Sequence, residues 1–423
     1  LGVSAVRNSD DWIGRKGEAE SMRYLLIFGL ITMIGCVDHE RPMNSVRDSV
    51  GITIVESAQP LFGDDFQILL SEEPRLDLGD ADAPLEYQYE SIEDAVSIPG
   101  LGYAVADRRQ NQIFLYDHSG NHRRTVGGPG GGPGEFQALG SLRVLGDSLL
   151  AFDWRNGRLS IFDLDGELLA TSQLEETEDS FHPIHTYNLS GVLGRELVVA
   201  PWAIMPLGHT DVGPYWDSAA VLIYGLDGRV QRELPEPYLT EMFVGTQGVS
   251  GRPFGSRTAI AVQGDRLFLG TGKSFEIKVF NSFGTLERII RRSWTPRAVT
   301  SAVVDSLIEF RIRQAGVTSR ADPRVEGFRR MLESAPVPDQ MPAFSWLLPD
   351  PLGRLWVREY EAPYEDVAQK WSLFDKEGAW VCSVSMPDRF DVRAFGETEV
   401  LGVWRDELNV QHFRVYGLEV PEK

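Results

Sequence analysis

The sequence Asn111-Gln-Ile-Phe-Leu-Tyr-Asp-His-Ser-Gly120 contains a phrase that recurs along the chain: an aromatic residue, then Asp, Gly or Asn, then usually Gly three positions further on. A run of apolar or β-favouring residues precedes each copy, and another follows each of the first five. Two such runs around a short turn are typical of a β-hairpin. The copies are Tyr116-Asp117 with Gly120, Phe162-Asp163 with Gly166, Tyr224-Gly225 with Gly228, Phe280-Asn281 with Gly284, Phe374-Asp375 with Gly378, and Tyr416-Gly417.

The spacing of this phrase predicts the architecture. Successive copies are separated by 46, 62, 56, 94 and 42 residues. A small sheet that recurs at about 40 to 50 residues indicates a radial repeat, in which each sheet buries its faces against its neighbours. We therefore predict an all-β fold, a six-bladed β-propeller, over residues 51–423. The sixth copy lacks both the final Gly and a following strand, so we expect an N-terminal strand, either 52–55 or 75–78, to complete the last blade and close the ring.

The longest spacing indicates an insertion. Residues 298–335 contain apolar residues at helical intervals, and Asp322-Pro323 is a typical N-cap and first-turn pair. We expect one or two amphipathic helices at about 298–335. A seventh blade is the alternative, but the stretch lacks the turn phrase and the alternation of β-branched residues.

The N-terminal region has the features of an export signal. Residues 25–35 form an apolar stretch that follows Met22-Arg23 and precedes Cys36, and this stretch is too short to span a bilayer. Met33-Ile34-Gly35-Cys36 resembles a bacterial lipobox, in which the Cys is acylated and becomes the mature N-terminus; an ordinary signal peptide with a chance Cys is the alternative. We expect an over-extended start at 1–21, a lipoprotein signal peptide at 22–35, a lipidated Cys36, and a polar tether at 36–50.

Composition agrees with an exported globular protein. The 423-residue chain has a formal net charge of −21, and removal of residues 1–35 takes away four basic and four acidic side chains, which leaves that charge unchanged. Such acidity argues against nucleic acid as a partner, because nucleic-acid binding depends on neutralising phosphates. With two cysteines, one of them the lipidation candidate, disulfides are not expected to hold the fold together.

A second motif carries a family resemblance. Val105-Ala-Asp107, residues 111–117 and the run Gly127-Gly-Pro-Gly-Gly-Gly-Pro-Gly134-Glu-Phe136 resemble NHL-type repeats of six-bladed propellers, and Gly-Pro-Gly-Glu-Phe is the specific part. This group includes protein-, nucleic-acid- and glycan-binding modules as well as lyases and lactonase-like hydrolases, so the resemblance implies a platform and leaves the activity open. The run is not a phosphate loop, because Glu135-Phe136 stands where Lys-Ser or Lys-Thr is needed. We expect a crossing between two blades.

Catalytic and metal-binding patterns are weak. His182, His185 and His209 lack ligand spacing and are interpreted as loop residues. Cys382 has no flanking basic group to activate it, and no nucleophile elbow occurs. The recurring carboxylates could hold calcium, but turn hydrogen bonds explain them better. They are Asp107, Asp117, Asp163 and Asp375.

Propeller topology indicates where a ligand would bind. The loops between the second and third strands of all blades lie on one face of the ring, and here they are basic and aromatic on an acidic protein. Arg and Trp together suit a planar or anionic ligand; equally, these side chains could serve to solvate loops and fill gaps between blades. The candidate ligand-binding face consists of Arg108, Arg109, Trp154, Arg155, Lys273, Tyr360 and Arg405.

From the sequence we expect a membrane-anchored lipoprotein of the bacterial cell envelope, on the periplasmic or outer-membrane side, that acts as a binding or scaffold module rather than an enzyme. Its expected partners are the membrane, through lipidated Cys36, and an envelope protein or carbohydrate-like ligand. No cofactor is expected, although a divalent metal such as calcium stays open. The enzymatic alternative is a metal-assisted hydrolase or lyase of the lactonase-like kind, and the structural alternative is an assembly partner that uses the helical insertion as its interface.

Overall fold

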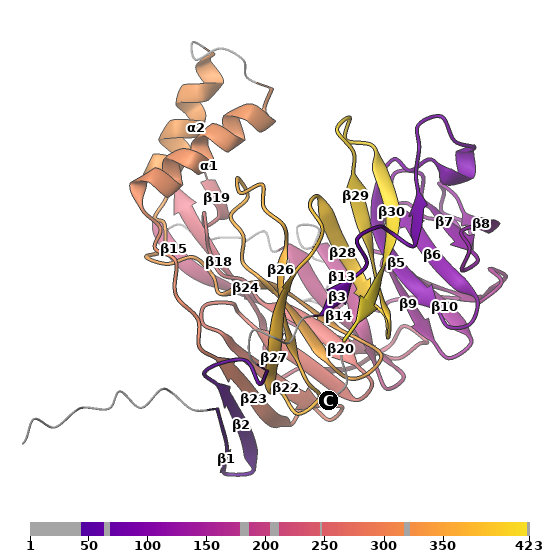
Figure 1. Ribbon diagram of the computed structural model, residues 1–423, viewed down its shortest axis with the longest axis horizontal. Helices are drawn as coiled ribbons and strands as arrows, with labels where there is room; N and C mark the ends of the chain where they lie inside the picture. Colours follow the sequence, from indigo (N-terminus) through magenta and orange to yellow (C-terminus); the bar gives the residue numbers. More distant parts are fainter. Residues whose placement is uncertain are drawn as a thin grey trace, which may run out of the picture. The chain divides into compact units, whose positions relative to one another are not determined.

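The computed structural model describes residues 44–62, 68–177, 186–203, 211–245, 248–316 and 322–420. Six antiparallel sheets follow one another along the chain as blades 1 to 6 (Figure 1). In blades 1 to 5 the strands pair in sequence order, apart from β15, which lies outside blade 3. The first strand of each blade contacts the first strand of the next, and β28 of blade 6 contacts β5 of blade 1, so the ring is closed. The fold is a six-bladed β-propeller, as predicted.

The first three blades occupy residues 92–233. Blade 1 contains β5 (Ile92–Ile98), β6 (Gly102–Asp107), β7 (Gln112–Tyr116) and β8 (His122–Gly127). Blade 2 contains β9 (Leu139–Leu145), β10 (Ser148–Asp153), β11 (Arg158–Asp163) and β12 (Leu168–Gln173). Blade 3 contains β13 (Thr186–Leu193), β14 (Glu196–Ala203), β16 (Leu222–Tyr224) and β17 (Val230–Glu233).

The last three blades occupy residues 259–419 together with a short N-terminal segment. Blade 4 contains β20 (Ala259–Gln263), β21 (Arg266–Gly270), β22 (Glu276–Asn281) and β23 (Leu286–Arg292). Blade 5 contains β24 (Phe344–Pro349), β25 (Leu355–Glu359), β26 (Lys370–Phe374) and β27 (Trp380–Ser385). Blade 6 contains β28 (Phe390–Phe395), β29 (Glu399–Arg405) and β30 (Gln411–Glu419), with β3 (Leu69–Leu70) and β4 (Leu76–Leu78).

The recurring sequence phrase forms the turn between the third and fourth strands of blades 1 to 5. In blade 1, Oδ1 of Asp117 accepts hydrogen bonds from the backbone N–H groups of Ser119 and Asn121, both at 2.9 Å. Asp163, Asn281 and Asp375 bind their own turns in the same way. The final Gly of each phrase has a positive φ of 79° to 88°, which a residue without Cβ adopts at low cost. The turn hydrogen bonds predicted at Asp117, Asp163 and Asp375 are therefore present in the structure.

The N-terminal segment runs past three blades. β1 (Ser45–Ser49) and β2 (Ile52–Ser57) form a hairpin, and β2 pairs in parallel with β23 at the outer edge of blade 4. Leu61 then donates its N–H to the carbonyl oxygen of Trp380 in blade 5, and β4 pairs with β30 to complete blade 6. Of the two predicted closing segments, residues 75–78 fill the role and 52–55 do not. β1 also corrects the boundary of the expected tether, because residues 45–49 are an exposed edge strand.

Each pair of neighbouring blades encloses an apolar cluster in the part of the chain that the structure describes. Blades 1 and 2, for example, bury Leu115, Phe136 and Phe162 together. Phe136 belongs to the Gly-rich run, in which the carboxylate of Glu135 accepts the N–H of Gly132 at 2.7 Å. The run therefore crosses from blade 1 to blade 2 as predicted, and Phe136 anchors it.

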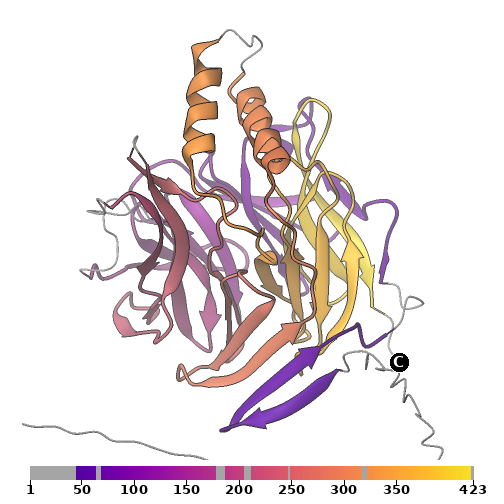
Figure 2. The same cartoon turned by 90° about the vertical axis from the view of Figure 1, so that its left-hand side faces the viewer.

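Two insertions extend from the same end of the ring (Figure 2). The helices α1 (Ser301–Gln314) and α2 (Pro323–Ser334) lie between blades 4 and 5, and the side chain of Asp322 caps α2 by accepting the N–H of Arg324. A separate sheet contains β15 (Gly213–Ala219), β18 (Tyr238–Gly245) and β19 (Gly248–Gly251). Phe254, directly after this sheet, packs with Leu307 and Ile308 of α1. The predicted helical insertion is confirmed, and neither helix is long and apolar enough to cross a membrane. The one further helix in the described chain is the short 3-10 turn η1 (Leu85–Tyr87).

Candidate functional site at the loop face

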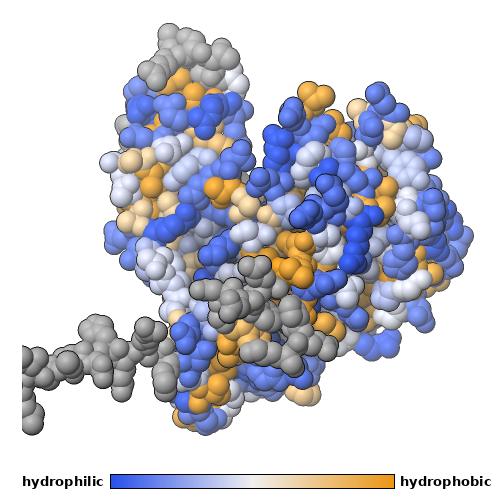
Figure 3. All heavy atoms as spheres, viewed as in Figure 1, coloured by the Kyte–Doolittle hydropathy of each residue, from blue (hydrophilic) through white to orange (hydrophobic). Residues whose placement is uncertain are grey.

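Strand direction divides the ring into two faces. We call the end that carries the connections between second and third strands, and between successive blades, the loop face; the other end, with the hairpins formed by the recurring phrase, is the turn face. Both insertions emerge from the loop face, because they lie in connections of these two kinds. Figure 3 shows the surface hollowed between the helical insertion and blade 6, with hydrophilic residues along the blade 6 side.

The seven predicted site residues all lie on the loop face, with different degrees of exposure. Arg109, Arg155 and Lys273 are exposed, and the Lys273 ammonium lies 5.8 Å from the ring centre of Trp216, which is itself 37% exposed. Such a distance allows a cation–π contact. Within the described chain, no hydrogen bond or ion pair holds the side chains of Arg109 and Arg155. These three cations are available to a ligand.

The remaining predicted residues have partners or packing roles. Arg108 forms an ion pair with Glu93 at 3.3 Å. Trp154 is partly buried against the cluster between blades 2 and 3. Tyr360 packs with the helical insertion, and burial raises its pKa to about 12. Arg405 is half-buried at the end of β29. No ion pair or hydrogen bond in the described residues joins any two of the seven, so the structure places them on one face without bringing them into contact.

The first strands of the blades hold charged residues that the sequence reasoning missed. Each first strand begins at the loop face and lies innermost in its blade. We use the name charged belt for Glu93, Asp94, Arg143, Arg358, Asp391 and Arg393. Arg358 comes from β25 of blade 5, and the others come from β28, β5 and β9 of blades 6, 1 and 2.

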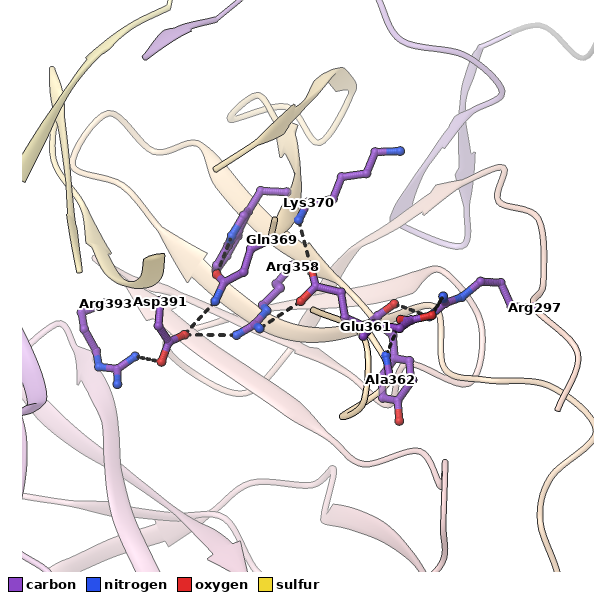
Figure 4. Close-up of polar contacts among 11 residues, drawn as sticks. Arg297, Arg358, Glu361, Ala362, Gln369, Lys370, Asp391 and Arg393 are labelled. Atoms are coloured by element: carbon purple, nitrogen blue, oxygen red, sulfur yellow. Dashed lines mark hydrogen bonds and ion pairs between the residues drawn. The ribbon is translucent and has the colours of Figure 1, made fainter. Parts of the chain in front are cut away.

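Ion pairs in the charged belt join blade 5 to blade 6 and blade 1 to blade 2. Arg358 of blade 5 contacts Asp391 of blade 6 at 3.3 Å, and Asp391 also pairs with Arg393 at 2.5 Å (Figure 4). Asp94 of blade 1 binds Arg143 of blade 2 at 2.8 Å, and Arg143 donates to the carbonyl oxygens of residues 189 and 190 in blade 3. The belt therefore occupies four consecutive blades, and hydrogen bonds from Arg143 reach the backbone of blade 3.

Local backbone irregularities accompany the belt. In five blades the register between first and second strands shifts, as at a β-bulge. In β5 the residue left out of register is Glu93, and in β28 it is Arg393. β20 of blade 4 pairs regularly with β21 and contributes no residue to the belt. Because bulges re-aim side chains and gather near functional sites, these irregularities favour a site along the first strands.

Burial and neighbouring charges shift the pKa values of three residues of the belt. Burial by itself raises the pKa of Asp391, but the charges of Arg393 and Arg358 and hydrogen bonds from Arg393 and Gln369 outweigh it, and the pKa is lowered. Burial raises the pKa of Glu93, and this effect exceeds the opposing attraction of Arg108 and Arg393. Burial lowers the pKa of Arg393, yet Asp391 and, across the blade boundary, Asp94 and Glu93 raise it overall. Burial therefore disfavours the ionised form of Glu93, whereas the neighbouring arginines favour that of Asp391.

Other predicted chemical groups can now be placed. Cys382 is buried, and burial raises the pKa of its thiol to about 12, so it is no nucleophile at neutral pH. Asp107 is buried and holds the backbone N–H groups of residues 90, 91, 109 and 110. No group of three His, Cys, Asp or Glu side chains in the described residues is arranged to hold a metal ion. His182, His185, His209 and Cys36 lie outside the described residues.

Comparisons with known proteins concern the fold. An exported protein of Bacteroides fragilis shares 11% identity at a TM-score of 0.47, covering 87% of this chain and 99% of its own. A duf4221 family member from Bacteroides vulgatus shares 12% identity at a TM-score of 0.49, covering 84% and 99%. A virginiamycin B lyase from Staphylococcus aureus shares 10% identity at a TM-score of 0.38, covering 84% and 100%. These likenesses carry no argument about function.

The curated proteins contain no match to the chain. Among family models, residues 94–190, which include blade 2 and most of blade 1, match the DUF5128 family, described as a 6-bladed beta-propeller.

Proposed function

We propose that this protein is a lipid-anchored module of the bacterial cell envelope that binds an anionic or carbohydrate-like extracellular ligand, or an exposed segment of a partner protein, at its loop face. The observation that carries the proposal is the charged belt: charged side chains lie on the first strands of three neighbouring blades and on the second strand of a fourth, and Glu93 and Arg393 stand at β-bulges. Burying charge costs free energy, and regular apolar strands, as in blade 4, would pack the ring without it.

Three exposed cations extend this site toward solvent. Arg109, Arg155 and Lys273 come from blades 1, 2 and 4 and stand on the same face as the belt. Guanidinium groups recognise carboxylates, sulfates and phosphates through paired hydrogen bonds. On a chain with a net charge of −21, three unpaired cations on one face suit an anionic substituent of the ligand. The NHL-type likeness of residues 105–136 fits a platform of this kind.

The anchor rests on the sequence. A diacylglyceryl group on Cys36, with a further acyl chain on its amino group, would hold the protein on a membrane, since one chain alone binds only marginally. We expect the wild-type precursor to incorporate labelled palmitate in bacteria and Cys36→Ser to lose the label. Equal labelling of both proteins would contradict the lipoprotein assignment.

The binding proposal is tested with an array of uronate-bearing, sulfated and neutral oligosaccharides, probed with the mature protein in detergent. We expect binding to acidic probes, weakened at least tenfold in the triple variant Arg109→Ala, Arg155→Ala, Lys273→Ala and reduced by salt, because charge-assisted contacts of about 1.5 kcal/mol or more each are lost. Equal binding of wild type and triple variant to every probe would contradict the role of these cations.

A further inference from the structure

One tryptophan stands beside the charged belt on a first strand. Trp346, in β24 of blade 5, is 42% exposed. Of the tryptophans whose side chains the structure describes, only Trp346 and Trp216 are so exposed. Aromatic side chains in a ring interior normally fill the gaps between blades. Trp356, on the neighbouring strand β25, does so: it stacks on Phe395 with 4.1 Å between the ring centres. Trp346 instead presents apolar area to solvent.

Strand pairing shows which way Trp346 faces. It lies directly opposite Arg358 in the ladder between β24 and β25, and Phe344 lies opposite Glu359. Residues directly opposite each other project from the same side of a sheet. Phe344 packs on Phe275 of blade 4, whereas Arg358 reaches Asp391 of blade 6. Trp346 therefore shares with Arg358 the side of blade 5 that faces blade 6.

The polar groups on this side form a neutral network (Figure 4). Arg358 contacts Glu361 at 3.1 Å and Asp391 at 3.3 Å, and Gln369 donates to Asp391 at 2.9 Å. With Arg393 the network contains two cations and two carboxylates, so it offers hydrogen-bond donors and acceptors without excess charge. Each ionised carboxylate has about four acceptor sites, and the network fills three at Asp391.

An exposed indole ring next to fixed, charge-balanced hydrogen-bonding groups matches the two sides of a pyranose. The C–H face of the sugar packs on an aromatic ring, and its neighbouring hydroxyl groups are both donors and acceptors. We propose that Trp346, Arg358, Glu361, Gln369 and Asp391 form a subsite for one pyranose ring of an oligosaccharide. This assignment rests on the proposed function of the loop face, because it names the sugar part of the ligand that the exposed cations serve.

The connection between blades 4 and 5 ties this subsite to Lys273. The carbonyl oxygen of Gly272 accepts the N–H of Ala343, three residues before Trp346. Lys273 thus lies on a loop hydrogen-bonded to the segment that leads into β24, and Trp216 of β15 lies beside Lys273. An acidic group on an adjoining sugar would meet Lys273, and the subsite itself is indifferent to charge.

The test uses a hexamer of galacturonate and the same hexamer with its carboxylates methyl-esterified, titrated into the mature protein by calorimetry. Trp346→Ala should weaken binding of both probes about tenfold, the loss expected for one aromatic stacking contact of about 1.5 kcal/mol. Trp346→Phe, which keeps a ring, should stay within a few-fold of wild type. Phe283→Ala is the matched control, since Phe283 is 85% exposed on the turn face, and it should leave both affinities unchanged.

The outcomes separate the subsite from the cation proposal. If the triple cation variant weakens only the acidic probe and Trp346→Ala weakens both, the two proposals are supported. If Trp346→Ala weakens both probes and the triple variant weakens neither, the subsite stands and the role of the cations fails. Wild-type affinity of a folded Trp346→Ala protein, or absence of binding of both probes to the wild type, would overturn the subsite.

Discussion

The turn-face hairpins and the charged belt of the loop face belong to the same blades but use their carboxylates in different ways. On the turn face, Asp117, Asp163 and Asp375 bind backbone N–H groups two and four residues ahead, and the pattern repeats from blade to blade. On the loop face, Asp94 and Asp391 of the charged belt bind arginines of neighbouring blades, whereas Asp107 and Asp153 bind backbone N–H groups as the turn carboxylates do. A local contact that repeats holds the fold together; long-range contacts that differ between blades offer distinct binding groups.

The largest expected effect tests the turn face. Gly228 ends the phrase of blade 3 with φ of +83°, and a Cβ there would lie 2.2 Å from the carbonyl oxygen of Gln173. We expect Gly228→Ala to lower the free energy of unfolding by about 3 kcal/mol, since both backbone strain and a backbone clash arise. Gly194, in the same blade, has φ of +63° and open space around it, so Gly194→Ala should cost only about 1 kcal/mol. Equal losses in urea unfolding would show that the close approach between hairpins is unimportant.

The next effect concerns the loop face. Asp391→Asn should lower the free energy of unfolding at pH 7 by about 2 kcal/mol, because Arg358 and Arg393 lose the anion that they share. This loss is somewhat less than that expected when one partner of a fully buried ion pair is removed. Since the folded-state pKa of Asp391 is lowered, its contribution to stability is present at neutral pH and is lost as the pH falls through that lowered pKa.

The gap between wild type and Asp391→Asn should therefore close in acid. Asp147→Asn serves as control, because Asp147 is exposed in the turn between β9 and β10. A gap that stays constant from pH 7 to pH 3 would contradict the ion-pair account.

A smaller effect tests whether the turn carboxylates act through their hydrogen bonds or through their charge. Asp163→Ala should cost about 1 kcal/mol, because two backbone N–H groups lose their acceptor. Asp163→Asn should cost less, since Asn281 caps the corresponding turn of blade 4. If Asn proved as harmful as Ala in thermal unfolding, charge rather than turn geometry would explain the recurrence of Asp.

The smallest effect has the opposite sign. Burial raises the pKa of Glu93, so the penalty for its ionised form is absent below the unfolded-state pKa and grows as the pH rises through the folded-state pKa. Glu93→Gln should therefore be more stable than wild type at pH 7, by less than about 1 kcal/mol, with the advantage vanishing near pH 4. A destabilised variant at pH 7 would show that the ion pair with Arg108 outweighs burial.

The same contrast explains what the sequence could predict. The turns, the blade number and the capped helix at Asp322-Pro323 depend on contacts a few residues apart or on repeat counting, and all were predictable. Repeat counting also predicted a closing N-terminal strand, but the choice of 75–78 over 52–55 came from the structure. The charged belt was not, because its partners are far apart in the chain: Asp94 and Arg143 by 49 residues, Arg358 and Asp391 by 33. A weak signal existed in the charged residues of Ile92-Glu-Asp-Ala95 and Phe390-Asp-Val-Arg393, where apolar first strands were expected.

The pairing of the N-terminal hairpin with blade 4 could not be predicted from the sequence either. Within the described residues, β1 pairs with β2, and β2 pairs in parallel with blade 4. Because residues 45–49 are polar, the sequence alone indicates that they are part of a tether. Exposed edge strands are commonly polar, and alternation cannot separate them from linkers. The seven loop residues could be assigned to one face from topology, but their packing or exposure depends on the insertions beside them.

The most direct test of the central claim compares three cations on each face. Arg109, Arg155 and Lys273 on the loop face are matched in type and exposure by Arg195, Arg229 and Lys376 on the turn face, and each set is replaced by Ala in the mature protein. Binding of the galacturonate hexamer, measured by calorimetry, should fall at least tenfold for the loop-face variant and stay unchanged for the turn-face variant. Equal losses, or a loss confined to the turn-face variant, would contradict the assignment of the loop face as the binding face.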